Sequence, residues 1–156
     1  NQMTDSNANF SGLPVGTRAV QLPDNSFNSQ SYFLTVFGRP DSSSSCECER
    51  SSDASLAQSL HLLNSKDIQS KLSSGSGRAA KLGNTNDKRE AEEKIRELFL
   101  LAFSREPSGS EVLLARQHLE RETEDDKGVK KAVPQKESYE DIIWALFNTK
   151  EFLFNH

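Results

Sequence analysis

The feature that most constrains the fold is a long amphipathic pattern between Asp87 and about Ser104. Apolar residues recur there at intervals of three and four, as they do on one face of a helix. They are Ile95, Leu98, Phe99 and Ala102, with Leu101 widening the stripe. The other face carries glutamates, lysines and arginines at helical spacing. This pattern predicts the strongest helix of the chain.

Weaker helical patterns precede this helix. A first helix is expected within residues 51–65, where leucines recur on one helical face behind serine and aspartate residues suited to capping. A second helix is expected from Lys66 to Leu72, with its apolar side chains on one face. The Ser-Gly run 73–77 breaks the pattern, and Arg78 to Leu82 predicts one more turn.

Two further helices are expected after the strongest one. Ser108 or Ser110 is placed to open a helix over Glu111 to about Glu122. Its predicted buried side chains are Val112, Leu113, Ala115 and Leu119. A charged stretch, 123–136, predicts a loop, and Ser138 begins a capping-box sequence for the last helix. The chain is therefore predicted to be mainly α, a small bundle of four to five helices.

The first third of the sequence has no helical period. Residues 1–12 are rich in polar residues and predict a disordered leader. Residues 13–50 are typical of an irregular, extended arm that ends in the C-E-C-E-R motif, with at most a short hairpin formed by Thr17–Leu22 and Tyr32–Phe37. The helical domain is expected to occupy residues 51–156.

Aromatic residues gather near the end of the sequence, at Trp144, Phe147, Phe152 and Phe154. Thr149 is placed to cap a final helical turn among them. We expect these aromatic side chains to be buried in the core. If they are exposed instead, they mark a surface that docks onto another part of the protein.

Charge and motif content narrow the classes of function. The formal net charge is -4 at pH 7, whereas nucleic-acid binding depends on Lys and Arg side chains that neutralise phosphates. A nucleic-acid partner is therefore not expected. The sequence has no apolar run near the ~20 residues of a membrane-spanning helix, and no recognisable catalytic motif. No cofactor is expected in this chain, and the sequence leaves the oligomeric state open.

The most distinctive candidate site combines Cys46 and Cys48 with His61 on the following predicted helix. Three interpretations stay open. The cysteines form a local disulfide, or lie buried as thiols, and pin the arm onto the first helix. Alternatively, they form a strained disulfide with a redox role. Together with the histidine, they also offer three ligands for a zinc or copper ion, although the spacing matches no standard zinc motif.

A second candidate set consists of charged residues in turn-like or apolar motifs of the arm. The arginines are Arg18, Arg39 and Arg50, and the acidic residues are Asp24, Glu47 and Glu49. A buried guanidinium group needs carboxylate or carbonyl partners. The set therefore predicts either a structural ion-pair network or a site for an anion such as sulfate, phosphate or a carboxylate.

Six segments occur in an order that is typical of one family. They are G-T-R-A-V-Q-L-P-D (16–24), Y-F-L-T-V-F-G-R-P (32–40), C-E-C-E-R-S (46–51), L-A-Q-S-L-H-L-L-N-S (56–65), L-F-L-L-A-F-S-R-E-P (98–107) and W-A-L-F-N-T-K-E-F-L-F-N-H (144–156). From about Leu13 onward, the chain resembles the C-terminal domain of unknown function in large planctomycete-type proteins. Those proteins join a cytochrome c-like domain to two domains of unknown function.

The resemblance implies that the chain is the last part of a longer polypeptide exported to the periplasm or cell surface, and that its partner is the rest of that polypeptide. Some relatives carry the haem-attachment motif C-x-x-C-H in another domain, so haem is implied only elsewhere in the full-length protein. The leading expectation is an accessory interaction domain. A redox or metal site on Cys46, Cys48 and His61 is the alternative, and a carbohydrate-associated binding role at the cell surface is a third interpretation.

Overall fold

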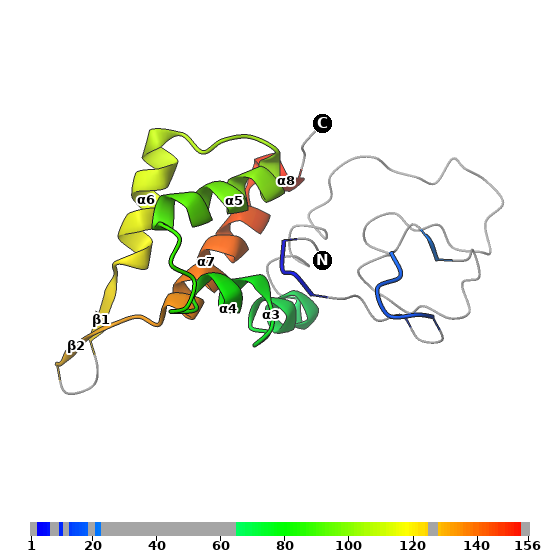
Figure 1. Ribbon diagram of the computed structural model, residues 1–156, viewed down its shortest axis with the longest axis horizontal. Coiled ribbons are helices and arrows are strands. Elements are labelled where there is room, and N and C mark those ends of the chain that lie inside the picture. The colour runs from blue at the N-terminus through cyan, green and yellow to red at the C-terminus, as the bar shows by residue number, and fades with distance from the viewer. Residues whose placement is uncertain are drawn as a thin grey trace. The chain divides into compact units, whose positions relative to one another are not determined.

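The computed structural model divides the chain into two compact units. One unit contains residues 1–6 and 66–156, and the other contains residues 7–65. The residues that the structure describes are 3–6, 10, 13–18, 21–22, 65–124 and 128–153. We call the first unit the helical unit, because it contains every helix and strand of the described residues (Figure 1).

The helical unit confirms the predicted mainly α class. Its described elements are helices α3 (Lys66–Leu72), α4 (Arg78–Leu82), α5 (Ala91–Phe103) and α6 (Gly109–Leu119), strands β1 (Glu122–Glu124) and β2 (Lys130–Ala132), and helices α7 (Gln135–Phe147) and α8 (Lys150–Leu153). Helix α7 crosses the unit and contacts α3, α4, α5 and α6 (Figure 1). It therefore provides the common surface on which the other helices pack.

The hydrophobic core lies along α7 and α5. Ile143, Ile95 and Leu98 are all 0% exposed. Leu72 of α3 and Leu82 of α4 belong to the same buried cluster. Helices as short as α3 and α4 are unstable alone, whereas a buried leucine contributes ~1.5–3 kcal/mol. Packing on α7 therefore stabilises them.

Helix ends that depend on neighbouring residues follow the predictions. Helices α3 and α4 have the expected bounds. Ser108 is the N-cap of α6: its hydroxyl accepts a hydrogen bond from the Glu111 N–H, and its own N–H donates to Glu111 Oε2 at 2.7 Å. Thr149 caps the last turn, because its Oγ1 accepts the Phe152 N–H at 3.2 Å. The predicted helix within 51–65 lies outside the described residues, apart from Ser65.

Helix α5 begins at Ala91, four residues later than the pattern predicts. The Arg89 N–H donates to Asp87 Oδ1 at 3.2 Å, and the Asp87 carbonyl accepts a bond from Lys94 Nζ at 3.0 Å. The side-chain carboxylate and the backbone carbonyl of Asp87 thus hold the chain in a loop. Side-chain hydrogen bonds to nearby backbone groups compete with helix formation.

Helix α7 begins at Gln135, so the predicted capping box at Ser138 is wrong. Pro134 precedes the helix, and its carbonyl accepts the Ser138 N–H at 3.2 Å. Ser138 is 0% exposed. The start of the helix is thus placed one turn earlier by a residue that has no N–H to satisfy.

The stretch predicted as a charged loop contains an antiparallel hairpin. Glu124 lies opposite Lys130, and Thr123 lies opposite Lys131. Opposite charges on facing strand positions stabilise such pairs. Gly128 has a φ of 73°, a backbone conformation that glycine adopts without a steric penalty.

The N-terminal segment Met3–Ser6 packs within the helical unit. Met3 and Thr4 are each 4% exposed, whereas the sequence predicted a disordered leader over 1–12. Burial of the methionine and contacts to the backbone of Thr4 account for the difference at these four residues. The other predicted domain boundaries stay predictions. Among the described residues, no helix is both long and apolar enough to cross a membrane.

Candidate functional site

Most of the site residues predicted from the sequence lie outside the described residues. These are Cys46, Cys48, His61, Arg39, Arg50, Asp24, Glu47 and Glu49. Their disulfide, redox, metal and ion-pair roles therefore stay predictions. Arg18 is described and exposed, and its backbone N–H donates to Gln21 Oε1 at 2.9 Å. Within the described residues, no group of three His, Cys, Asp or Glu side chains is arranged to hold a metal ion.

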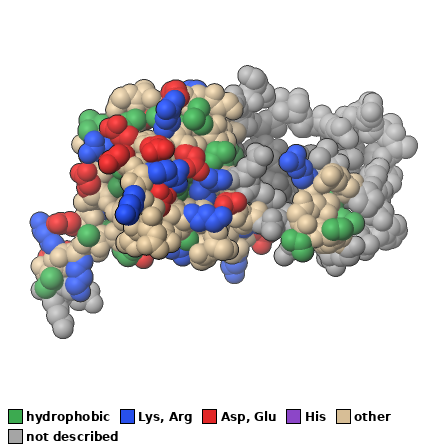
Figure 2. Space-filling model, viewed as in Figure 1, with side chains coloured by type: hydrophobic (Ala, Val, Ile, Leu, Met, Phe, Trp, Pro, Cys, Tyr) green, Lys and Arg blue, Asp and Glu red, His purple; other side chains and the backbone are tan. Residues whose placement is uncertain are grey.

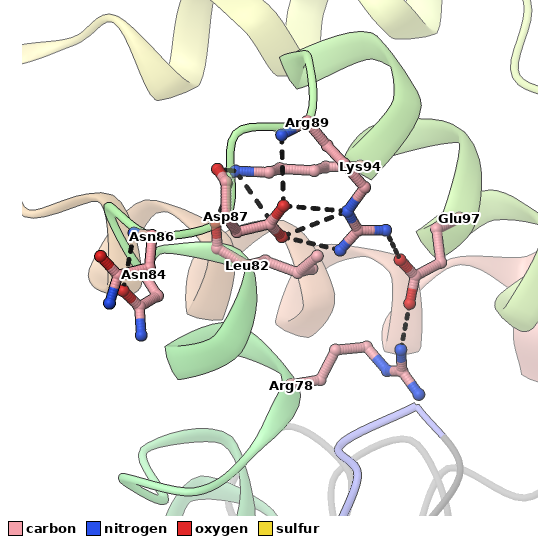
Figure 3. Close-up of polar contacts among 8 residues, drawn as sticks. All are labelled: Arg78, Leu82, Asn84, Asn86, Asp87, Arg89, Lys94 and Glu97. Atoms are coloured by element: carbon pink, nitrogen blue, oxygen red, sulfur yellow. Dashed lines mark hydrogen bonds and ion pairs between the residues drawn. The ribbon is translucent and has the colours of Figure 1, made fainter.

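A polar cluster that the sequence did not predict lies between α4 and α5 (Figure 3). It consists of Arg78, Asp87, Arg89, Lys94 and Glu97.

The centre of the polar cluster is Lys94, which is only 8% exposed. Its Nζ donates to the carbonyls of Leu82 and Asp87, both at 3.0 Å. It also lies 3.9 Å from Asp87 Oδ2. A buried ammonium group is tolerated when its donors are satisfied in this way. Lys94 thus fastens the end of α4 and the following loop to α5.

Arg89 connects the two acidic residues of the polar cluster. Its Nη2 donates to Asp87 Oδ2 at 2.7 Å, and its Nη1 donates to Glu97 Oε2 at 2.7 Å. The hydrogen bond from Arg89 lowers the pKa of Asp87 to about 2. Hydrogen bonds to Asp87 and Glu97 raise the pKa of Arg89, so Asp87 and Arg89 stay charged through the physiological pH range.

Arg78 is the last member of this chain of contacts. Its Nη1 pairs with Glu97 Oε1, while its Nε donates to the Met3 carbonyl at 3.1 Å. In Figure 3 the Arg78 guanidinium lies between Glu97 and the N-terminal segment, which is drawn in pale blue. The arrangement is suited to holding Arg78 in one orientation toward the backbone of that segment.

A second ionic cluster is centred on Arg105, two residues after the end of α5. Its Nη2 donates to Glu111 Oε1 at 2.8 Å, and its Nε donates to Glu151 Oε1 at 2.6 Å. Its guanidinium carbon lies 5.5 Å from the ring centroid of Phe99 and 5.3 Å from that of Phe103. A guanidinium is attracted to aromatic ring faces, so these two rings hold Arg105 against α5. Its carboxylate partners belong to α6 and α8, and Arg105 therefore links the three helices.

Acid is expected to weaken this second cluster. The hydrogen bond from Arg105, followed by that from the Ser108 N–H, lowers the pKa of Glu111 from 4.5 to about 2. A carboxylate with a lowered folded-state pKa adds stability above its unfolded-state pKa and loses it as the pH falls toward the folded value. We expect the melting temperature to fall between pH 4.5 and 2, and to fall less in Arg105→Met.

Circular dichroism melts across this pH range test the expectation. Arg96→Met is the matched control, because Arg96 and its partner Glu106 are 60% and 54% exposed, and exposed pairs contribute little. Parallel curves for wild type and Arg105→Met would contradict the assignment.

These clusters escaped sequence analysis because their members come from different elements. The polar cluster joins α4, the following loop and α5, and the Arg105 cluster joins residues of α6 and α8. Arg105 and Glu151 are 46 residues apart, and no periodicity relates them. One local signal was present: Lys94 directly precedes the buried Ile95 of the apolar stripe. A lysine beside such a stripe has its aliphatic stem in the core and needs acceptors for its ammonium group.

Large apolar side chains are exposed on α6 and α7. Leu113 is 59% exposed, Leu114 69% and Trp144 38%. The expectation that Leu113 and Trp144 are buried is therefore wrong. Of the other aromatic residues, Phe147 and Phe152 pack against the core, with their ring centroids 4.9 Å apart. Phe154 lies outside the described residues.

The register of α6 and α7 places Leu114 and Trp144 on the same side of the helix pair. The two helices run in opposite directions (Figure 1), and His118 Nε2 lies 3.3 Å from Asp141 Oδ2. One turn before the histidine is Leu114, and about one turn after the aspartate is Trp144. We call Leu113, Leu114 and Trp144 the α6–α7 apolar surface.

Charge is evenly mixed on the face of the helical unit in Figure 2. Lys and Arg side chains alternate there with Asp and Glu side chains, and small hydrophobic areas lie between them. An extended electrostatic potential of one sign would steer a highly charged ligand toward the protein. This mixed face presents no such potential.

Comparison with known families identifies this chain. The model of a family described as PSD1, protein of unknown function (DUF1553), matches residues 5–119. The chain belongs to the DUF1553 family. Neither the curated proteins nor the solved structures gave a match.

The compact unit of this DUF1553 chain extends beyond the matched residues. The match ends at Leu119, the last residue of α6. Helix α7 follows and supplies Tyr139 and Ile143 to the same core, at 2% and 0% exposure. Burial raises the pKa of Tyr139 to about 12. The helices matched by DUF1553 thus depend on α7 to cover their apolar faces.

Proposed function

We propose that this DUF1553 chain is an accessory interaction domain at the C-terminus of a larger, exported polypeptide of the planctomycete type. Its partner is the rest of that polypeptide, which includes a cytochrome c-like domain. The resemblance of the six sequence motifs supports this context. The observation that carries the interaction role is the exposure of the α6–α7 apolar surface.

Single exposed leucines are ordinary on protein surfaces, but α6 exposes more large apolar side chains than it buries. Its buried residues are Ala115 and Leu119, whereas Leu113 and Leu114 are consecutive and exposed. Burying each leucine against a partner is worth ~1.5–3 kcal/mol. Trp144 adds a residue type that is enriched among energetically dominant interface contacts.

Crosslinking in the full polypeptide tests the proposal. A photoreactive amino acid replaces Leu114, and a matched sample carries it at Lys88, an exposed loop residue outside the α6–α7 apolar surface. We expect crosslinks from position 114 to the preceding domains of the same polypeptide, and fewer from position 88. Equal crosslinking at both positions would contradict the proposal.

The double variant Leu113→Asp, Leu114→Asp separates an interaction role from a role in folding. Substitutions at exposed sites usually change stability by less than ~0.5 kcal/mol each, so we expect a nearly unchanged urea midpoint. Crosslinking from a photoreactive residue at Trp144 should nevertheless be lost, because two aspartates cannot be buried at an apolar interface. Unfolding of the variant would show that the leucines stabilise the fold itself.

The redox or metal site on Cys46, Cys48 and His61 and the carbohydrate-associated role stay predictions from the sequence. Thiol titration and metal analysis of the folded chain test the first of these. A glycan array tests the second.

A further inference from the structure

We propose that the helical unit contains a peptide-binding site built around Arg78, and that residues 3–6 of the same chain are its bound ligand. This inference goes beyond the proposed interaction role, because it rests on residues that are not part of the α6–α7 apolar surface. Its ligand class is a short peptide recognised through its backbone and one apolar anchor.

Arg78 recognises two successive backbone carbonyls of the segment. Its backbone N–H donates to the Thr4 carbonyl at 2.9 Å, and its side-chain Nε donates to the Met3 carbonyl at 3.1 Å. Buried carbonyl groups need such partners, and contacts of this kind hold a peptide whatever its side chains are. One residue of the helical unit therefore fixes the position of two consecutive peptide groups.

Met3 gives the site its selectivity, and Asp5 adds only a weak contact, because its ion pair with Lys81 is largely exposed, at 42% and 62%. Met3 is 4% exposed and belongs to the hydrophobic core cluster. Asp5 pairs with Lys81 of α4. Asp5 also has a φ of 51°, a left-handed conformation that aspartate tolerates better than most residues. The segment therefore turns directly after Thr4, which brings its carboxylate to α4.

Contacts outside the segment orient the recognising arginine. Glu97 holds the Arg78 guanidinium, and Glu97 is itself held by Arg89 (Figure 3). Gly77 leaves room for the backbone of the segment. A Cβ at that position would lie only 3.1 Å from the Thr4 carbonyl oxygen. Preorganised contacts bind a ligand at lower entropic cost than mobile ones do.

The segment is also distant in the sequence from the site it occupies. Met3 and Arg78 are 75 residues apart, and the intervening residues 7–65 form a compact unit of their own. The contacts of residues 3–6 are therefore those of a docked peptide. A free peptide of the same sequence is expected to compete for the site.

Cleavage of the folded chain of 156 residues, without the preceding domains, tests this proposal. A site-specific protease sequence is inserted after Ser6, the chain is cut in its folded state, and the product is analysed by gel filtration and mass spectrometry. We expect the released N-terminal peptide to co-elute with the rest of the cut chain. An excess of fluorescent peptide covering residues 1–6 should then displace it. A peptide with Met3→Asp should compete at least ~10-fold more weakly, because it loses its apolar anchor.

A substitution in the rest of the chain provides the second test, in which binding of the fluorescent peptide is measured. Arg78→Lys retains the charge and the backbone N–H but lacks the Nε donor, and should bind the fluorescent peptide more weakly. Arg96→Lys, at a side chain 60% exposed, should bind as wild type does. Immediate loss of the peptide from the cut wild-type chain would overturn the proposal. Equal competition by the Met3→Asp peptide would overturn it as well.

Discussion

Replacing Lys94 with methionine is expected to destabilise the chain by ~2–4 kcal/mol. Methionine preserves the aliphatic volume of the side chain but removes the ammonium group. The carbonyls of Leu82 and Asp87, which each accept a 3.0 Å hydrogen bond from it, would then lack this donor. Buried acceptors without partners cost far more than the net value of the bonds they made.

Urea unfolding followed by circular dichroism measures this effect. Lys88→Met is the matched control, because Lys88 is exposed in the same loop, and it should change stability by less than ~0.5 kcal/mol. If Lys94→Met and Lys88→Met have the same midpoint, then Lys94 does not fasten the loop to α5.

Gly83→Ala is expected to destabilise the chain by ~1–3 kcal/mol. The conformational entropy of the unfolded chain suggests the opposite sign: the φ of Gly83 is -80°, and replacing glycine at such a φ ordinarily stabilises a protein by ~0.4–1 kcal/mol. The packing of α4 against α7 reverses this. An added Cβ would lie 2.5 Å from the backbone nitrogen of Lys136 and 2.7 Å from its Cα. Backbone atoms at the start of α7 cannot rotate away as a side chain would.

The matched control is Gly109→Ala, at the first residue of α6. No atom lies within 4 Å of a Cβ built at Gly109, so its substitution should be neutral or slightly stabilising. A stabilising effect at both positions would contradict the close approach of α4 and α7.

Lys94→Met and Gly83→Ala both alter contacts that position α4, the helix that carries the proposed peptide site. Lys94 and Gly83 hold the C-terminal end of α4, while Arg78 opens the same helix. A five-residue helix keeps its position only through such tertiary contacts. Binding of the N-terminal peptide should therefore weaken in both variants.

Local chemistry explains which parts of the fold were predictable. The bounds of α3 and α4, the capping box at Ser108 and the cap at Thr149 each depend on residues within one helical turn. One of the failures has a different origin. The late start of α5 depends partly on Lys94, whose Nζ reaches back to the carbonyl of Asp87 seven residues earlier. No local propensity contains that contact.

The candidate sites divide in the same way. The cysteine and arginine motifs of the arm were visible as sequence patterns and remain predictions. The polar cluster and the Arg105 cluster were invisible, because they join residues from different elements. Leu113 illustrates the limit of periodicity: it was expected to be buried, but it lies on the opposite side of α6 from Ala115 and is 59% exposed.

By itself, the sequence determined that the chain is mainly helical, where its short helices break, and which stripe of α5 is buried, because period and capping are properties of neighbouring residues. Only the tertiary structure decided which apolar side chains stay exposed and which charges meet. It also decided that residues 3–6 belong with helices more than sixty residues away. Those outcomes depend on which surfaces α7 covers and which backbone carbonyls are buried, and both are set by contacts between distant parts of the chain.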